Sequence, residues 1–365
     1  MGAMWNGARA FTATSGPGVS LMNEFLGLGY FAEVPTVLID VQRTGPSTGM
    51  PTRTQQSDIL LAAYASHGDT KHPLLFPASP KECFEMTVDA FDLTERLQTP
   101  VIIMTDLDLG MNDHISEPLT WDDSRVYDRG KVLTSAQLDK IYHAMSNGNG
   151  NGNNVEAQPD QEAEHAGDFL EQFNSKWGRY LDIDGDGIPY RTIAGTNPTR
   201  GAFVTRGSSR DEYGVYTEDG AAYQRNVDRL AKKWDTAKEL VPQPEIRLAV
   251  SGQQSAVNSD SEIRNGVIYF GTSSYAAEEA LELLAADGIH LDAMRARGFP
   301  FGKSFRDFVD SHATLFVIEQ NRDAQFRSLM MIELGVDPAK LVSILNYDGM
   351  PITADNIHRQ IKAAF

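Results

Sequence analysis

A strand–turn–helix unit lies near the start of the chain, with the sequence Phe11-Thr12-Ala13-Thr14-Ser15-Gly16-Pro17-Gly18-Val19-Ser20-Leu21-Met22. We predict a short strand over residues 10–13 and a helix over residues 19–28, where apolar side chains recur at helical spacing. The turn between them lets backbone N–H groups approach a ligand and leads into a helix N-terminus, where anions are favoured. Glycine-rich turns are common, so taken alone the unit also fits a plain tight turn.

Strands and helices alternate through the first third of the chain. Residues 35–41 and 100–105 are apolar runs typical of strands buried on both faces. Helices are predicted over residues 54–64 and 79–97, the second with the Ser79 and Glu82 spacing of a capping box. A weaker strand is predicted over residues 71–77. This order predicts a parallel sheet with right-handed crossovers.

A second α/β unit is predicted towards the C-terminus, with strands at residues 267–270 and 315–318 and helices at residues 276–285, 325–334 and 354–364. We therefore expect an α/β protein with three regions: a first sheet domain at 1–120, an irregular connecting region at 121–262 and the second α/β domain at 263–365. The connecting region contains an amphipathic helix at residues 222–240. Its Asn/Gly run from Asn147 to Asn154 is predicted to be a flexible insertion.

Composition limits the classes of partner. The formal net charge of −18 argues against nucleic acid, because phosphate backbones select basic surfaces. No apolar run approaches the ~20 residues of a membrane span, and no secretory signal is visible, so we expect a cytoplasmic protein without a membrane partner. The single cysteine, Cys83, cannot ligate an iron–sulfur cluster by itself, so any such cluster would belong to another polypeptide.

Two arginines stand in the loop after the strand at residues 35–41, whose sequence continues Arg43-Thr44-Gly45-Pro46-Ser47-Thr48-Gly49-Met50-Pro51-Thr52-Arg53. Ligands of open α/β sheets bind at the C-terminal ends of the strands. An arginine there is always charged and can fork onto a carboxylate. Arg43 and Arg53 are therefore candidate binding or catalytic residues for a small anionic substrate, although most single loop arginines are simply exposed.

Two further polar motifs follow the predicted elements. His67, in His67-Gly68-Asp69, is a candidate catalytic residue because it lies close in sequence to the arginine loop, although a lone histidine is more often a plain loop residue. Glu319-Gln320-Asn321 ends a predicted strand. This polar set fits a cleft or an interface, and it fits a plain turn equally well.

An acidic turn contains the low-ranking candidates for a metal site, Asp182, Asp184 and Asp186. Their alternate spacing and the glycine at Gly187 resemble the first half of a calcium loop. Ile193 stands where the bidentate glutamate should be, so a structural turn is favoured. A calcium-binding structural protein is the remote alternative function.

Together the motifs resemble the alpha subunits of 2-oxoacid:ferredoxin oxidoreductases, the family of 2-oxoglutarate and pyruvate ferredoxin oxidoreductases. The matching segments follow in order over nearly the whole chain: the turn at 12–22, the loop at 40–56, and residues 67–69, 184–192, 211–214 and 319–322. The resemblance implies a parallel-sheet thiamine-enzyme pyrimidine-binding domain, followed by a transketolase-C-terminal-like α/β domain.

The resemblance also implies a function. It is the coenzyme A-acylating oxidative decarboxylation of a 2-oxoacid, or the reverse, and the Gln-Arg-x-Gly-Pro-Ser-Thr-Gly pattern favours 2-oxoglutarate over pyruvate. Thiamine diphosphate would be shared with a beta subunit that supplies Mg²⁺ and the iron–sulfur cluster, in an α2β2 or αβ assembly that reduces ferredoxin. Arg53 would pair with the substrate carboxylate and Arg43 would shape the same wall. The thiamine pocket would be lined by Thr14, Ser15, Gly16, Pro17 and Gly18.

By the same resemblance, a Tyr-Pro-Ile-Thr-Pro-like segment and a glutamate that activates the cofactor would lie upstream of Met1. We therefore expect the pyrimidine-binding domain to be N-terminally incomplete, and the isolated chain to be inactive. Either the sequence starts at an internal methionine of a longer protein, or it is a natural fragment. The alternative function is that of a truncated, non-catalytic subunit that supports assembly.

Overall fold

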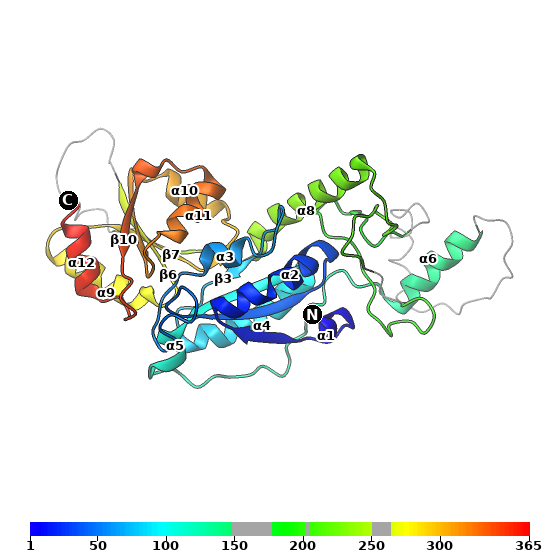
Figure 1. The fold of residues 1–365 in the computed structure, drawn as a ribbon, viewed down its shortest axis with the longest axis horizontal. Helices are drawn as coiled ribbons and strands as arrows, with labels where there is room; N and C mark the ends of the chain where they lie inside the picture. The colour runs from blue at the N-terminus through cyan, green and yellow to red at the C-terminus, as the bar shows by residue number, and fades with distance from the viewer. Residues whose placement is uncertain (148–176, 202–204, 250–263) are drawn as a thin grey trace.

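The structure, a computed structural model, describes residues 1–147, 177–201, 205–249 and 264–365. The described chain forms two mostly parallel sheets: the first lies, except for one short late strand, in the blue-to-cyan part of Figure 1, and the second lies in the yellow-to-red part. The predicted α/β fold is confirmed. The predicted Asn/Gly insertion falls, apart from its first residue, outside the described residues.

The first sheet has the strand order β1-β2-β4-β3-β8. Its first four strands run parallel, and β8 pairs with β3 in the antiparallel sense. The strands are β1 (Phe11–Thr14), β2 (Thr36–Gln42), β4 (Pro100–Asp106), β3 (Leu74–Leu75) and β8 (Gly298–Phe299). Because β8 lies far along the sequence, the C-terminal region completes the N-terminal sheet.

Helices cover both faces of the first sheet. Apolar side chains of α2 (Gly16–Ala32) and α3 (Ile59–Ala63) pack with Leu38 on one face. The other face packs against α4 (Pro80–Leu97) and α8 (Gly220–Leu240). Side chains along a strand alternate between faces, so Asp40 and Gln42 share the α2 and α3 side with Leu38.

The second sheet has the order β10-β9-β6-β7-β5, parallel except for the antiparallel β5. One of its faces is covered by α9 and α12, and its other face shares a continuous apolar core with α2, α3 and the first sheet. The elements are β5 (Glu245–Arg247), β6 (Asn265–Phe270), α9 (Ser273–Ala286), β7 (Asp292–Ala296), α10 (Lys303–Asp310), β9 (Thr314–Glu319), α11 (Gln325–Leu334), β10 (Leu341–Leu345) and α12 (Ala354–Lys362).

The remaining elements are short or peripheral: α1 (Gly2–Trp5), α5 (Leu107–Met111), α6 (Ser135–Asn147) and a 3₁₀ turn at Pro338–Lys340. The predicted helix at 54–64 is shorter than expected, because helical structure begins only at Ile59. Ser79 Oγ accepts a hydrogen bond from the Glu82 N–H at 3.2 Å, as the capping prediction requires. The Glu82 carboxylate, however, accepts the N–H of Ala78 at 2.8 Å.

The C-terminal end of α2 is held by a buried cluster of charges. Glu33 is fully buried, and its carboxylate pairs with Arg229 and, at 2.9 Å, with Lys233. The backbone carbonyl of Glu33 accepts a hydrogen bond from Arg179 at 3.0 Å. Although burial opposes it, the charges of Arg229 and Lys233 hold the pKa of Glu33 well below its usual range. Arg179, in the irregular region, and two residues of α8 therefore anchor the end of α2.

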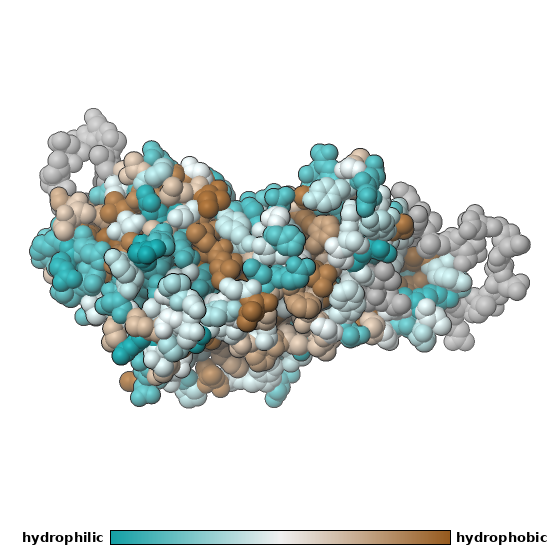
Figure 2. All heavy atoms as spheres, viewed as in Figure 1, coloured by the Kyte–Doolittle hydropathy of each residue, from teal (hydrophilic) through white to brown (hydrophobic). Residues whose placement is uncertain are grey.

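Apolar and hydrophilic residues gather on different parts of the surface. Figure 2 shows apolar residues gathered along the middle of one face, over the junction of the two sheets, whereas the α9 and α12 region is mostly hydrophilic. Among the described residues, no helix combines the length and the apolar character that crossing a bilayer requires.

Candidate functional site

The loop at residues 43–54 carries both predicted arginines, and hydrogen bonds join its two ends. The backbone N–H of Thr44 and its hydroxyl both donate to the Arg53 carbonyl, at 2.9 and 3.1 Å. The same hydroxyl lies 3.1 Å from the Thr54 carbonyl. The joined ends of the loop lie at the C-terminal end of β2. The structure therefore places both arginines at the edge of the sheet where ligands of this fold class bind.

The two guanidinium groups differ in their surroundings. Arg53 is exposed, and its Nη1 lies 3.3 Å from Met350 Sδ in the loop before α12. A Cβ atom at Gly349 would come within 3.1 Å of the Arg53 side chain, so the two segments pack closely. Arg43 is half-buried, and its Nε has no hydrogen-bond partner among the described residues. Arg43 is therefore the more enclosed of the two cations.

Two carboxyl groups flank the arginine loop in the sequence, Asp40 before it and Asp58 after it. Asp40 is fully buried in β2, and neither of its carboxyl oxygens has a partner within the described part of the chain. Burial, reinforced by the charge of Asp58, raises the pKa of Asp40. Burial also raises the pKa of Asp58 to about 6, against the opposing effects of the Gly16 N–H and Arg43. Strongly shifted acids of this kind concentrate at functional sites.

The predicted glycine turn lies against the Asp58 side chain. Gly16 is the first residue of α2, and a Cβ atom there would come within 2.5 Å of Asp58 Oδ1. A Cβ atom at Gly18 would overlap the Thr14 hydroxyl. A larger residue at either position would require the Asp58 or the Thr14 side chain to move, so the turn from Thr14 to Gly18 packs tightly against Asp58 at the N-terminus of α2.

Gln56 joins this edge of the first sheet to the second. Its Nε2 donates to Asp106 Oδ2 at 3.1 Å and to Thr272 Oγ1 at 3.2 Å. Its backbone N–H donates to the Gln320 carbonyl at 2.8 Å, and its carbonyl accepts the Asn321 amide at 3.0 Å. The polar set after β9, at residues 319–321, is thus at an interface, which was one of its expected settings.

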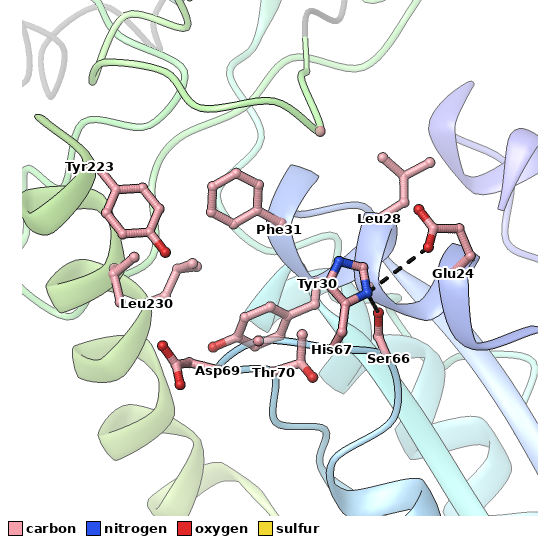
Figure 3. Close-up of a pocket in the computed structure, with 14 residues that line it drawn as sticks. Glu24, Leu28, Tyr30, Phe31, Ser66, His67, Asp69, Thr70, Tyr223 and Leu230 are labelled. Atoms are coloured by element: carbon pink, nitrogen blue, oxygen red, sulfur yellow. Dashed lines mark hydrogen bonds and ion pairs between the residues drawn. The ribbon is translucent and has the colours of Figure 1, made fainter. Parts of the chain in front are cut away.

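His67 lies in a different place. It lines a cavity of about 330 Å³ between α2, the loop at residues 66–70 and α8. Figure 3 shows Tyr30, Phe31 and Tyr223 around the same cavity. The His67 ring is 4.0 Å from the Glu24 carboxylate and its side chain is 82% exposed. Neither arginine lines this cavity, so the structure does not bring His67 together with Arg43 and Arg53.

The acidic turn already holds a protein cation. Lys131 Nζ lies 2.6 Å from Asp184 Oδ2 and 2.8 Å from Asp186 Oδ1. Asp182 instead accepts the backbone N–H groups of Gly185 and Gly187, at 2.9 and 3.0 Å. Among the described residues, no group of three or more metal-ligating side chains is placed to hold a metal ion.

The chain is similar to known proteins over nearly its whole length. Residues 1–165 match the family described as pyruvate flavodoxin/ferredoxin oxidoreductase, thiamine diphosphate-binding. Over 99% of the chain, 29% of residues are identical to 2-oxoacid:ferredoxin oxidoreductase 2, subunit alpha, of Aeropyrum pernix, of which 49% is covered. The chain is a relative of the alpha subunits of 2-oxoacid:ferredoxin oxidoreductases. The predicted resemblance is confirmed.

A second relative and a solved structure are also similar to this chain. The 2-oxoglutarate synthase subunit KorA of Methanothermobacter marburgensis is 28% identical over 98% of the chain and 80% of its own length. The fold matches a solved 2-oxoglutarate:ferredoxin oxidoreductase from Magnetococcus marinus, with a TM-score of 0.76 and 24% identity, over 99% of this chain and 54% of the other. The chain spans about half the length of the Aeropyrum alpha subunit.

Four polar residues at this edge of the first sheet were not predicted from the sequence to be site residues: Asp40, Asp58, Gln56 and Asp106. Asp40 could have been noticed, because it is a charged residue inside an otherwise apolar strand. Asp106 could have been noticed too, because it is the last residue of a buried strand, just as Arg43 directly follows one. Gln56 and Asp58 carry no such local signal, since their contacts lie with residues distant in the sequence.

Proposed function

We propose that the chain works as the alpha subunit of a thiamine diphosphate-dependent 2-oxoacid:ferredoxin oxidoreductase. The reaction converts a 2-oxoacid and coenzyme A to an acyl-coenzyme A and carbon dioxide, or runs in reverse. Two electrons pass through an iron–sulfur cluster of a beta subunit to ferredoxin. The observation that carries the proposal is the loop that holds Arg43 and Arg53 at the C-terminal end of β2, in a chain related to these subunits along nearly its whole length.

The two arginines suit an acid with two carboxylates. Arg43, half-buried and with an unpartnered Nε, would fork onto the carboxylate beside the oxo group. Arg53, at the open side of the loop, would bind the distal carboxylate. A fixed cation holds the departing carboxylate in place while the surrounding protein excludes water, which favours loss of its charge as carbon dioxide. We therefore propose 2-oxoglutarate as the substrate, ahead of pyruvate.

The residues present fit one half of the cofactor. The turn from Thr14 to Gly18 offers backbone and hydroxyl groups, and Asp58 Oδ2 is a buried oxygen with no partner in the described chain. These groups suit the donors and acceptors of an aminopyrimidine. No metal-ligating cluster occurs among the described residues, so the diphosphate and its Mg²⁺ would be held by the beta subunit. When bound, thiamine diphosphate stabilises the charge that develops on the oxo carbon.

The proposal is tested by producing the chain together with a beta subunit and following the reduction of a viologen dye. Dye reduction should require both coenzyme A and a 2-oxoacid, and 2-oxoglutarate should give the higher kcat/KM. Failure of every 2-oxoacid to reduce the dye in an assembled complex would contradict the enzymatic function. Assembly without turnover would favour the non-catalytic alternative instead.

A further inference from the structure

We propose that the cavity between α2, the loop at residues 66–70 and α8 binds a small organic ammonium ion that carries an apolar body. The cavity has a volume of about 330 Å³, which is within the range of small-molecule sites. It shares no lining residue with the arginine loop, and the proposed function makes no use of it. The proposal therefore adds a second ligand to the chain.

One part of the cavity lining is apolar and aromatic. α2 contributes Leu28 and Phe31 to it, and α8 contributes Tyr223 and Leu230, as Figure 3 shows. One face of Phe31 is covered by Arg210, whose guanidinium carbon lies 4.3 Å from the ring centroid. Tyr223 is 48% exposed, and no described cation lies over its ring. The electron-rich face of Tyr223 is therefore available to a bound cation.

The charged side chains of the lining are acidic. Glu24 and Asp69 line the cavity, whereas no lysine or arginine of the described chain does so. Asp69 has no ion pair with a described residue, and the ion-pair partner of Glu24 is the His67 ring at 4.0 Å. Lys71, which directly follows the loop, is instead paired with Glu333 at 2.9 Å. Two carboxylates without a strong cation partner favour a positively charged ligand and repel anions.

Tyr30 supplies a polar group that the protein itself does not use. The residue is only 9% exposed, yet its hydroxyl has no hydrogen-bond partner among the described residues, whereas a buried tyrosine hydroxyl usually has one. Its ring packs edge-on against His72, with the centroids 5.8 Å apart. Figure 3 shows the hydroxyl on the side of the cavity where Asp69 and Leu230 lie. This oxygen can accept a hydrogen bond from an ammonium group.

The loop that carries Asp69 is packed firmly on α2. A Cβ atom at Gly27 would come within 2.0 Å of Ser66 Oγ, and the Ser66 N–H donates to Asn23 Oδ1 at 3.1 Å. Ser66 has a φ of 87°, a left-handed conformation that is costly for a residue other than glycine. At the other end of the loop, the Thr70 hydroxyl donates to a backbone carbonyl at 2.8 Å. Because the loop is already ordered, a ligand loses little affinity to fixing it.

Isothermal titration calorimetry of the purified full chain tests the proposal, with phenethylammonium chloride as the probe. Phenethyl alcohol and phenylacetate serve as the neutral and the anionic probe of nearly the same shape. Phenethylammonium should bind at least about 10-fold more tightly than either of them, because only its charge is complementary to the two carboxylates. No binding of phenethylammonium at millimolar concentrations, or equal affinity for the three probes, would overturn the proposal.

Two variants locate the site. Asp69→Asn should weaken the binding of phenethylammonium about 10-fold, because it removes a charge from the lining. Tyr30→Phe should weaken it about 3-fold and leave Tm unchanged, since the hydroxyl has no described protein partner to lose. Asp228→Asn is the matched control, because Asp228 is an exposed acid of α8 that does not line the cavity, and its affinity should stay within about 2-fold of wild type.

The proposal is overturned if Asp69→Asn and Tyr30→Phe both bind phenethylammonium as wild type does. It is also overturned if the control loses as much affinity as Asp69→Asn, because the effect would then come from the overall charge of the surface. The calorimetric readout needs no turnover, so a failure of the proposed oxidoreductase function leaves this test intact.

Discussion

Gln56 Nε2 and Asp106 Oδ2 lie 3.1 Å apart, and the Thr272 hydroxyl bonds to both. The contact joins the loop after β2, the end of β4 and the start of α9. Gln56 Oε1 accepts from the Ser273 hydroxyl at 3.5 Å, and the residue as a whole is 1% exposed. The arginine loop is held at its far end by residues that directly follow β6 and β9, so its geometry depends on how the two sheets meet.

Gln56→Glu should destabilise the protein by about 2–3 kcal/mol, because a buried donor is lost and a second carboxylate is placed beside Asp106. Chemical denaturation measures the change in the free energy of unfolding. Gln55→Glu, at the adjacent half-buried position, should change it by less than about 0.5 kcal/mol. Equal effects of the two substitutions would contradict the role assigned to Gln56.

Glu33→Gln should cost about 3–5 kcal/mol of stability, because it leaves the buried charges of Arg229 and Lys233 without their carboxylate. The pKa of Glu33 is lowered in the folded state, so its contribution is present above its ordinary pKa and is lost as the pH falls below it. The difference between wild type and variant should therefore shrink in acid. Glu212→Gln, which breaks the exposed pair with Arg225, should cost about 1 kcal/mol or less.

Asp58→Asn should stabilise the protein at neutral pH. The folded-state pKa is raised from 3.8 to about 6, so the folded protein holds a proton that the unfolded chain has released. The stability that this proton brings is complete below pH 3.8 and is lost as the pH rises to about 6. Removing the charge should therefore add about 2 kcal/mol near pH 7 and nothing near pH 3. Denaturation curves at both values check this, and a gain that is the same at both would refute it.

Arg43→Ala and Arg53→Ala, each in the complete enzyme, should lower kcat/KM for the 2-oxoacid. A lost charge-assisted pair costs on the order of 2–5 kcal/mol, so Arg43→Ala should remove most turnover, whereas Arg53→Ala should mainly raise KM. Arg322→Ala is the control, since that exposed arginine pairs only with its neighbour Asp323 among the described contacts. Steady-state kinetics that match the wild type in both loop variants would exclude these roles.

The apolar strands were the elements that the sequence predicted best. β2, β4, β6 and β9 are dense in β-branched residues and lie where expected. β7 was missed because it carries Asp292 and Arg295, which break the apolar pattern. Both are buried in the structure, where Arg295 pairs with Glu82 and Asp292 with His312. A strand whose charges are neutralised by distant partners has no signal in its own sequence.

Only part of the candidate site could be predicted from the sequence. The arginines follow a clear strand and a run of small residues, so their place at the sheet edge could be inferred. Gln56 could not, because its side-chain partner Thr272 is 216 residues away in the chain. Residues 54–58 were predicted to be helical and are not, since their polar groups bond to the second sheet rather than to one another.

The pairing of β8 with β3 matters for anyone who divides this protein into pieces. Leu74 and Leu75 find their outer neighbours in Phe299 and Gly298. A fragment truncated before that point would present bare backbone along β3, which invites association between copies. The missing strand is short enough to be supplied as a peptide, so two separately expressed halves of this chain are a natural starting point for a split-protein reporter.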